Sequence, residues 1–189
     1  MPIAALRPLA FCALVSTFAG SFALAQEAKP GEPPLVTRNR VELNLRGAEV
    51  ILDHAQVKAK SMGLLMNLAV VDAGGHLLAF ARMDGARPAS GQTALTKAVA
   101  AATFRQESGP LPPGGEPNLL LSLSLPAAAA ASGGKLTALK GGVPIVVDGQ
   151  VIGAVGVGGG TGEQDAEVAK AGIQALLDLL KAPDPHAAE

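Results

Sequence analysis

Apolar residues recur at helical spacing along the segment 41–62. Successive apolar positions there are three or four residues apart, which places them on one face of an α-helix. The stripe consists of Val41, Leu45, Ala48, Leu52, Ala55, Ala59 and Met62. Thr37 can cap the start of such a helix and Gly63 is typical of a helix end, so the pattern predicts a helix over residues 37–62.

The opposite face of this predicted helix carries a second apolar line. Leu43, Val50 and Val57 follow one another at intervals of seven residues, which is close to two helical turns. A helix that is apolar on two sides needs two partners, and its own sheet supplies only one of them. We therefore expect the chain to form a homo-oligomer through this second line.

Five short apolar runs have the length and the flanking turn residues of β-strands. They span residues 65–71, 77–81, 136–139, 143–147 and 151–157. The sequence Asp72-Ala73-Gly74-Gly75 has the turn chemistry of a hairpin, and Gly141-Gly142 and Asp148-Gly149 supply two more tight turns. Short turns join neighbouring strands in opposite directions, so we expect an antiparallel sheet.

Helical patterns separate and follow these strands. Residues 90–106 predict a second helix, and Thr161 with Gln164 forms a capping box at the start of a last helix. Residues 118–131 leave open whether they form a short helix. The order of helix, two strands, helix, three strands and helix predicts one α/β domain over residues 37–181, in which helices pack against a five-stranded antiparallel sheet.

The N-terminal 25 residues have the three-part layout of a secretory signal peptide. Arg7 precedes an uncharged apolar run over residues 9–22, and Ala23-Leu24-Ala25 gives a small-x-small cleavage pattern. The run is shorter than a bilayer-spanning helix. We therefore expect residues 1–25 to be removed and the mature chain to be periplasmic or secreted, without a membrane span. The segments expected to be disordered are 26–36 and 182–189.

The composition of the expected mature chain narrows its chemistry. Removal of residues 1–25 leaves 14 of the 15 basic residues beside all 16 acidic ones. Because no basic stripe exists, binding to nucleic acid has no electrostatic support. Cys12, the single cysteine, is also removed. This excludes disulfides, thiolate metal sites, covalent haem attachment and a cysteine nucleophile in the mature chain.

The candidate binding groups are few. His76 follows the hairpin glycines, whereas His54 lies off the main stripe of the first helix. For each of them an ordinary solvent-exposed histidine is the alternative. Arg82 and Arg87 could hold a carboxylate or propionate by bidentate hydrogen bonds, or belong to a structural loop network. Lys97 lies among alanines and is either a desolvated Schiff-base candidate or a lysine whose head reaches solvent.

No catalytic signature accompanies these groups. The chain contains no His-x-x-x-His pair, no Gly-x-Ser-x-Gly elbow and no phosphate-loop spacing in its glycine-rich run at 153–162. A nucleophile, a general base and an acid cannot be placed together from the sequence. We therefore expect a binding protein rather than an enzyme.

Several ordered segments resemble one known family. They are Val70-Val71-Asp72-Ala73-Gly74-Gly75-His76-Leu77-Leu78-Ala79-Phe80-Ala81-Arg82-Met83-Asp84-Gly85, Lys97-Ala98, Gly141-Gly142-Val143-Pro144-Ile145, and Gly149-Gln150-Val151-Ile152-Gly153-Ala154-Val155-Gly156-Val157. Together they resemble the GlcG/HbpS family over about residues 37–181. The resemblance implies an α/β/α sandwich with a profilin-like or PAS-like outline, and oligomers. Members include exported haem-binding proteins linked to redox sensing and haem handling, and domains fused to corrinoid adenosyltransferases.

The resemblance implies haem as the cofactor but leaves the iron ligand open. Where the family often has a threonine after the lysine–alanine pair, this chain has Ala100. We expect an exported haem-binding protein with His76 as the metal ligand, because this histidine lies inside a matching segment and imidazole is a good iron ligand. His54, Arg82 and Arg87 are the further candidates for cofactor binding. The alternatives are a non-catalytic oligomeric accessory or structural subunit without haem, and a corrinoid-binding module.

The signal-peptide pattern yields a prediction about processing. The abundant folded product should begin at Gln26 and be found in the periplasm or the medium, because signal peptidase accepts the Ala-Leu-Ala site before it. N-terminal sequencing of the purified protein checks this, and a folded product that retains Met1 would contradict it.

Overall fold

The computed structural model describes residues 36–112, 116 and 118–181, and the compact unit begins at Asn39. The expected signal peptide and the tail after residue 181 lie outside the described residues, as does the expected leader except for Val36. The elements are α1 (Leu45–Ser61), β1 (Asn67–Asp72), β2 (Leu77–Arg82), α2 (Ala89–Phe104), α3 (Leu119–Ala131), β3 (Gly142–Val147), β4 (Gln150–Gly158) and α4 (Gly162–Lys181). None of these helices is long and apolar enough to cross a membrane.

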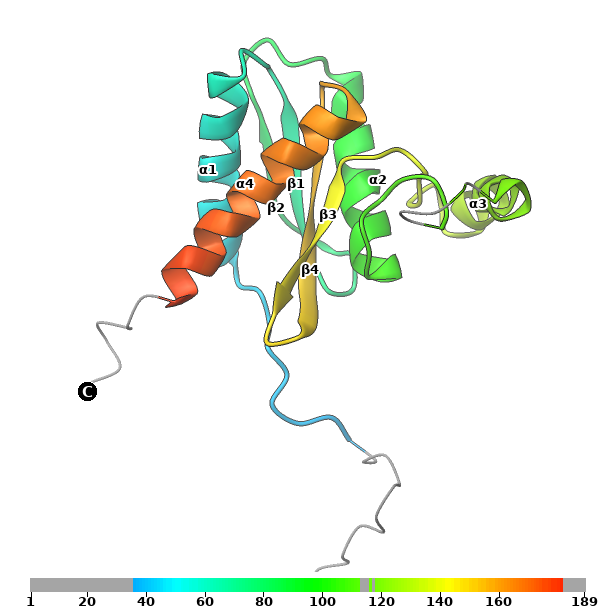
Figure 1. The fold of residues 1–189 in the computed structure, drawn as a ribbon, viewed down its shortest axis with the longest axis horizontal. Coiled ribbons are helices and arrows are strands. Elements are labelled where there is room, and N and C mark those ends of the chain that lie inside the picture. Colours follow the sequence, from blue (N-terminus) through cyan, green and yellow to red (C-terminus); the bar gives the residue numbers. More distant parts are fainter. Residues whose placement is uncertain (1–35, 113–115, 117, 182–189) are drawn as a thin grey trace, which may run out of the picture. The chain divides into compact units, whose positions relative to one another are not determined.

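The described strands form one antiparallel sheet in the order β2-β1-β4-β3. Helices α1 and α4 pack against one face of this sheet, and α2 covers the other, as Figure 1 shows. The arrangement is an α/β/α sandwich, which confirms the predicted α/β class and the predicted layers. The chain crosses from β2 to β3 through α2 and α3.

The predicted five-stranded sheet is wrong, because the described residues form a sheet of four strands. Residues 136–139 are irregular and pair with none of the strands of the described sheet. Its Leu136 side chain packs against the α2 layer, and the carbonyl of Leu139 accepts a hydrogen bond from the buried Ser108 hydroxyl at 2.8 Å. A side chain therefore satisfies the backbone group that a fifth strand would have paired.

The first helix begins eight residues later than predicted. Asn44, rather than Thr37, caps it, and its Oδ1 accepts a hydrogen bond from the Gly47 N–H at 2.9 Å. Leu43 therefore precedes the helix and packs against the core. Only Val50 and Val57 of the predicted second apolar line lie on α1, and Val57 is 64% exposed.

The remaining element predictions are confirmed with small shifts of their bounds. The β1–β2 and β3–β4 hairpins form. Residues 118–131, which the sequence left open, contain α3, which Asn118 caps. The capping box at the start of α4 is reciprocal: Thr161 N–H donates to Gln164 Oε1 at 2.9 Å, and Gln164 N–H donates to Thr161 Oγ1 at 3.3 Å.

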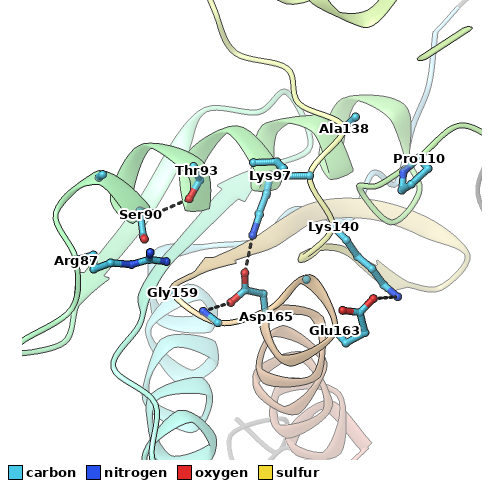
Figure 2. Close-up of a pocket in the computed structure, with 14 residues that line it drawn as sticks. Arg87, Ser90, Thr93, Lys97, Pro110, Ala138, Lys140, Gly159, Glu163 and Asp165 are labelled. Atoms are coloured by element: carbon cyan, nitrogen blue, oxygen red, sulfur yellow. Dashed lines mark hydrogen bonds and ion pairs between the residues drawn. The ribbon is translucent and has the colours of Figure 1, made fainter. Parts of the chain in front are cut away.

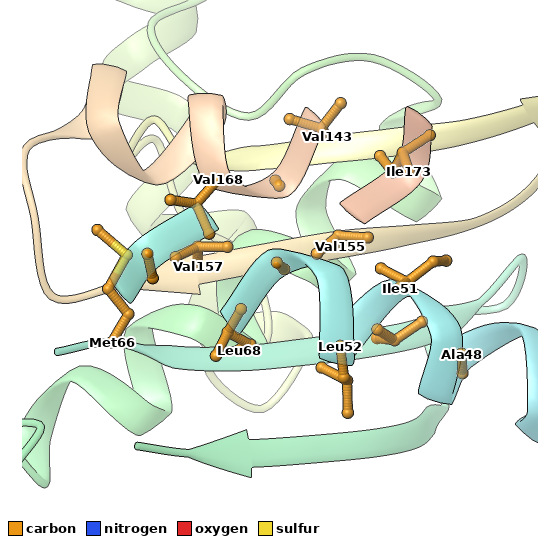
Figure 3. Packing of buried hydrophobic residues seen from close by; sticks show 14 of the residues in the cluster. Ala48, Ile51, Leu52, Met66, Leu68, Val143, Val155, Val157, Val168 and Ile173 are labelled. Carbon is orange, nitrogen blue, oxygen red and sulfur yellow. The ribbon is translucent and has the colours of Figure 1, made fainter. Parts of the chain in front are cut away.

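The core has two parts because side chains along each strand alternate between the faces of the sheet. On the side of α1 and α4, Leu68, Val155 and Val157 meet Ile51 and Val168, as Figure 3 shows. On the side of α2 the buried side chains are smaller, and they are mostly alanine and valine. Helix α2 therefore lies close to the sheet.

Glycines in β3 and β4 make this close approach possible. A Cβ at Gly156 would collide with the backbone carbonyl of Ala94 in α2, and a Cβ at Gly142 would collide with the carbonyl of Lys97. Because backbone atoms of a packed helix cannot move aside easily, only glycine fits at these positions.

This packing predicts that Gly156→Ala lowers the free energy of unfolding by about 2 kcal/mol or more, since the added methyl overpacks the α2–sheet contact. Gly91→Ala in α2 is the matched control: its added Cβ would meet Phe80 at 3.4 Å, an ordinary contact. That control should change stability by no more than about 1 kcal/mol, in the stabilising direction. Urea unfolding of both variants checks this, and equal stabilities would contradict the close-packing argument.

Candidate functional site

A pocket of about 750 Å³ opens at the end of the sheet where β4 leads into α4. Figure 2 shows that its lining side chains come from α2, from the start of α4 and from the irregular segment before β3. The lining residues are Arg87, Ala89, Ser90, Thr93, Lys97, Pro110, Ala138, Leu139, Lys140, Gly159, Gly160, Gly162, Glu163 and Asp165. The pocket holds neither of the two histidines that the structure describes.

A buried ion pair lies at the base of this pocket. Lys97 Nζ of α2 and Asp165 Oδ2 of α4 are 2.6 Å apart, and their side chains are only 6% and 1% exposed. Lys97 Nζ also donates to the carbonyl of Val157 at 2.9 Å, and Asp165 Oδ1 accepts from Gly160 N–H at 3.0 Å. The two charges are thus paired and further hydrogen-bonded, as buried charges must be.

The alternative in which the Lys97 head reaches solvent is wrong. The close approach of α2 to the sheet places this side chain inside the protein, where Asp165 compensates its charge. The sequence offered one signal for this partner, because Asp165 lies in the first turn of the amphipathic helix α4. The partner could not be assigned without the topology that brings α4 beside α2.

The rim of the pocket carries further charges and hydroxyl groups. Lys140 Nζ lies 3.3 Å from Glu163 Oε1. The backbone N–H of Glu163 itself, followed by Lys140, lowers the pKa of the Glu163 carboxyl, so this group stays ionised. Arg87 is exposed at the opposite side of the rim, as Figure 2 shows. The Thr93 hydroxyl donates to the carbonyl of Ser90 at 3.0 Å.

His76 lies at the other end of the sheet, directly after the β1–β2 turn. Its side chain is 81% exposed, and its Nδ1 lies 3.1 Å from Asp72 Oδ2. Asp72 Oδ1 accepts hydrogen bonds from the N–H groups of Gly74 and His76, both at 2.8 Å. Partial burial acts to raise the pKa of Asp72, but the hydrogen bonds from His76 and Gly74 outweigh it and lower that pKa.

A hollow of about 420 Å³ adjoins His76. Its apolar lining includes Leu43, Leu78 and Ile152, and its charged side chains are Arg40, Glu42 and Asp72. The sequence did not single out Arg40, because this residue lies before α1 and far from the hairpin along the chain. The strand order brings β4 beside the β1–β2 hairpin, and the segment before α1 runs across this end.

The structure does not bring the four predicted binding residues together. His54 is exposed on α1 and lines a separate hollow against α4, beside Gln174 and Asp178. Arg82 ends β2, about 20 Å along the strand from His76, and Arg87 lines the pocket at that far end. Within a single chain, neither arginine can bind a group held at His76 through short contacts.

No group of three or more His, Cys, Asp or Glu side chains that could hold a metal ion occurs within the described ranges. A metal bound here by protein groups alone would therefore lack the usual ligand set, whereas a metal carried by a macrocycle needs only one or two axial ligands.

Comparison with known proteins identifies the family. Residues 43–174 match the family described as "Haem degrading protein HbpS-like". The chain belongs to the HbpS-like family. The protein GlcG of Escherichia coli K12 is 41% identical over 120 residues, which make up 64% of this chain and 84% of GlcG. The family resemblance seen in the sequence is thereby confirmed.

Two solved structures share the fold of this chain. A double mutant of HbpS from Streptomyces reticuli has a TM-score of 0.60 and 27% identity, and the match covers 78% of this chain and 99% of that one. A structure described as the PduOC:heme complex has a TM-score of 0.59 and 25% identity, over 71% of this chain and 95% of that one.

The buried ion pair predicts a specific pattern of stabilities. Lys97→Met should lower the free energy of unfolding by about 3–5 kcal/mol, because it leaves the Asp165 carboxylate buried without a partner. The double variant Lys97→Met/Asp165→Asn carries no buried charge and should recover part of this loss. Urea unfolding measures both. A Lys97→Met variant within about 1 kcal/mol of the unaltered protein would contradict the pairing.

Proposed function

We propose that this chain is an exported haem-binding protein of the HbpS-like family, with a role in haem handling or redox sensing. Family membership and the likeness to a haem-complexed PduOC structure support the cofactor. The Asp72–His76 pair is the observation that carries the proposal to particular residues.

The Asp72–His76 pair has the chemistry of a metal-ligating histidine. Histidines that bind metals commonly donate their other ring N–H to a carboxylate, which fixes the tautomer and the ring orientation. An ionised carboxylate can only accept, so Asp72 favours the tautomer in which Nδ1–H donates to it, and in the neutral ring the lone pair of Nε2 is then left for a ligand. The backbone N–H groups of Gly74 and His76 both donate to Asp72, so the β1–β2 turn fixes the position of the pair.

The surroundings of His76 also fit a haem group. Leu43, Leu78 and Ile152 offer an apolar surface for a macrocycle, and Arg40 offers a guanidinium for a propionate. In this position Arg40 takes the role that the sequence had suggested for Arg82 or Arg87. The bound iron would supply ligand-binding and one-electron chemistry, while the chain supplies the axial ligand and the apolar cover.

A second subunit would complete the cover over an otherwise exposed ligand. Strand β2 is an edge of the described sheet, and Leu77 and Phe80 on it are exposed. Val57 on α1 adds another exposed apolar side chain. Apolar groups on an open edge strand favour contact with another copy of the chain. We therefore propose a homo-oligomer in which a second copy of the chain covers the exposed side chains of β2 and α1 and the ligand at His76.

The second candidate function is a non-catalytic accessory or structural subunit that assembles without haem. The exposed apolar side chains on β2 and α1 favour it independently of His76. A corrinoid-binding module is the third reading. A haemin titration of the purified protein, followed at the Soret band, distinguishes haem binding from both of these alternatives.

The site assignment predicts different effects for the two described histidines. His76→Ala should weaken haemin binding at least about tenfold and shift the Soret band, because it removes an axial ligand. Asp72→Asn should weaken binding about 10–100-fold, the usual cost of a lost partner of a ligating histidine. His54→Ala should leave affinity and spectrum nearly unchanged.

Two outcomes of this titration would contradict the assignment. If His76→Ala binds haemin with the affinity and spectrum of the unaltered protein, His76 is not a ligand. If His54→Ala instead loses binding, the site lies between α1 and α4. Circular dichroism of each variant checks that the fold is retained.

A further inference from the structure

The large pocket beside the Lys97–Asp165 pair contains a cation that pairs with none of the acids in the described part of the chain. Lys97 is paired with Asp165, and Lys140 is paired with Glu163. Arg87, which also lines the pocket, makes no ion pair with any acid that the structure describes. The lining side chains therefore carry one positive charge in excess.

The Ser90 hydroxyl group and the Lys97 ammonium group complete the polar side of this pocket. Ser90 is only 6% exposed and lines the pocket, and no hydrogen bond joins its Oγ to another of the described residues. Lys97 Nζ has three N–H donors, of which two are bonded, to Asp165 and to the carbonyl of Val157. The Ser90 hydroxyl and the third N–H of Lys97 are therefore both free to bond a polar group placed in the pocket.

We propose that this pocket binds a small organic molecule that bears a single carboxylate. Arg87 holds the carboxylate by charge-assisted hydrogen bonds, and Ser90 and Lys97 bond its oxygens or a neighbouring polar group. Pro110, Ala138 and Leu139 contact the carbon body of the ligand. The volume of about 750 Å³ lies within the range of small-molecule sites.

The charge of the lining selects a monoanion over a phosphate. One unpaired cation compensates one negative charge, whereas a dianion would bring an uncompensated charge into a partly buried site. A haem propionate is the other source of a carboxylate. The proposed iron ligand His76 lies at the opposite end of the sheet, so a free acid is the ligand we infer.

Fluorine NMR of small probes tests this proposal directly. The purified protein should broaden the ¹⁹F line of 4-fluorobenzoate or of fluoroacetate at concentrations up to about 10 mM. The neutral 4-fluorobenzamide should bind at least about tenfold more weakly, and the dianionic 4-fluorophenylphosphonate should not bind more tightly than the carboxylates. Saturating haemin should leave the carboxylate bound.

Two variants and a matched control locate the probe. Arg87→Gln should weaken carboxylate binding about tenfold or more, and Ser90→Ala should weaken it about two- to tenfold. Arg46→Gln removes the same charge from an exposed position on α1, on the other face of the sheet, and should change binding by less than about twofold. Thermal unfolding confirms that each variant is folded.

Each of the following outcomes would overturn the proposal. Absence of broadening by both carboxylates, or equal binding of the amide, would show that the pocket does not recognise a carboxylate. Equal effects of Arg87→Gln and Arg46→Gln would show non-specific attraction. Tighter binding of the phosphonate would indicate a phosphate site, and displacement by haemin would assign the pocket to a haem propionate.

Discussion

The buried ion pair between Lys97 and Asp165 is the interaction on which the arrangement of this protein depends most. It joins α2, on one face of the sheet, to the first turn of α4, which packs on the other face. Removing two charges from water costs several kcal/mol for each ion, and their attraction offsets this cost only with good geometry and additional hydrogen bonds. The carbonyl of Val157 and the N–H of Gly160 supply those bonds. The pair therefore specifies how the two helical layers meet at this end of the sheet.

The close packing of α2 makes this pair possible. Glycines in β3 and β4 and alanines in α2 let the helix backbone approach the strands, which brings the Lys97 side chain within reach of α4. The same end of the sheet then holds the large pocket, whereas the β1–β2 turn at the other end presents His76. The fold thus places the two polar regions at opposite ends of the strands. Hydrogen bonds at the start of α4 position the Lys97–Asp165 pair, and hydrogen bonds in the β1–β2 turn position His76.

Local sequence signals predicted most of the elements. The hairpin glycines, the Thr161–Gln164 capping box and the apolar stripe of α1 act over a few residues, so they can be recognised without tertiary structure. The start of α1 was misplaced because Thr37 and Asn44 are both good caps, and only packing distinguishes them. The fifth strand was wrong because residues 136–139 are apolar for packing against α2, not for pairing.

The candidate sites were predicted less completely, since they depend on contacts between distant segments. His76 and Asp72 are four residues apart, so their pairing lay within reach of the sequence pattern. Arg40 reaches the same hollow from before α1, and Asp165 reaches Lys97 from 68 residues away. Neither contact has a local signature. Arg82 and Arg87 show the converse: they are near His76 in sequence, but the structure places a full strand between them and His76.

The central claim is that haem binds at the β1–β2 turn, away from the Lys97–Asp165 pair. A crystal structure of the haemin-loaded mature protein tests it most directly. The account predicts iron bound to Nε2 of His76, with Asp72 still paired to Nδ1 and the Lys97–Asp165 pair unchanged. Iron beside His54, or a macrocycle seated in the pocket lined by Arg87 and Lys97, would contradict it.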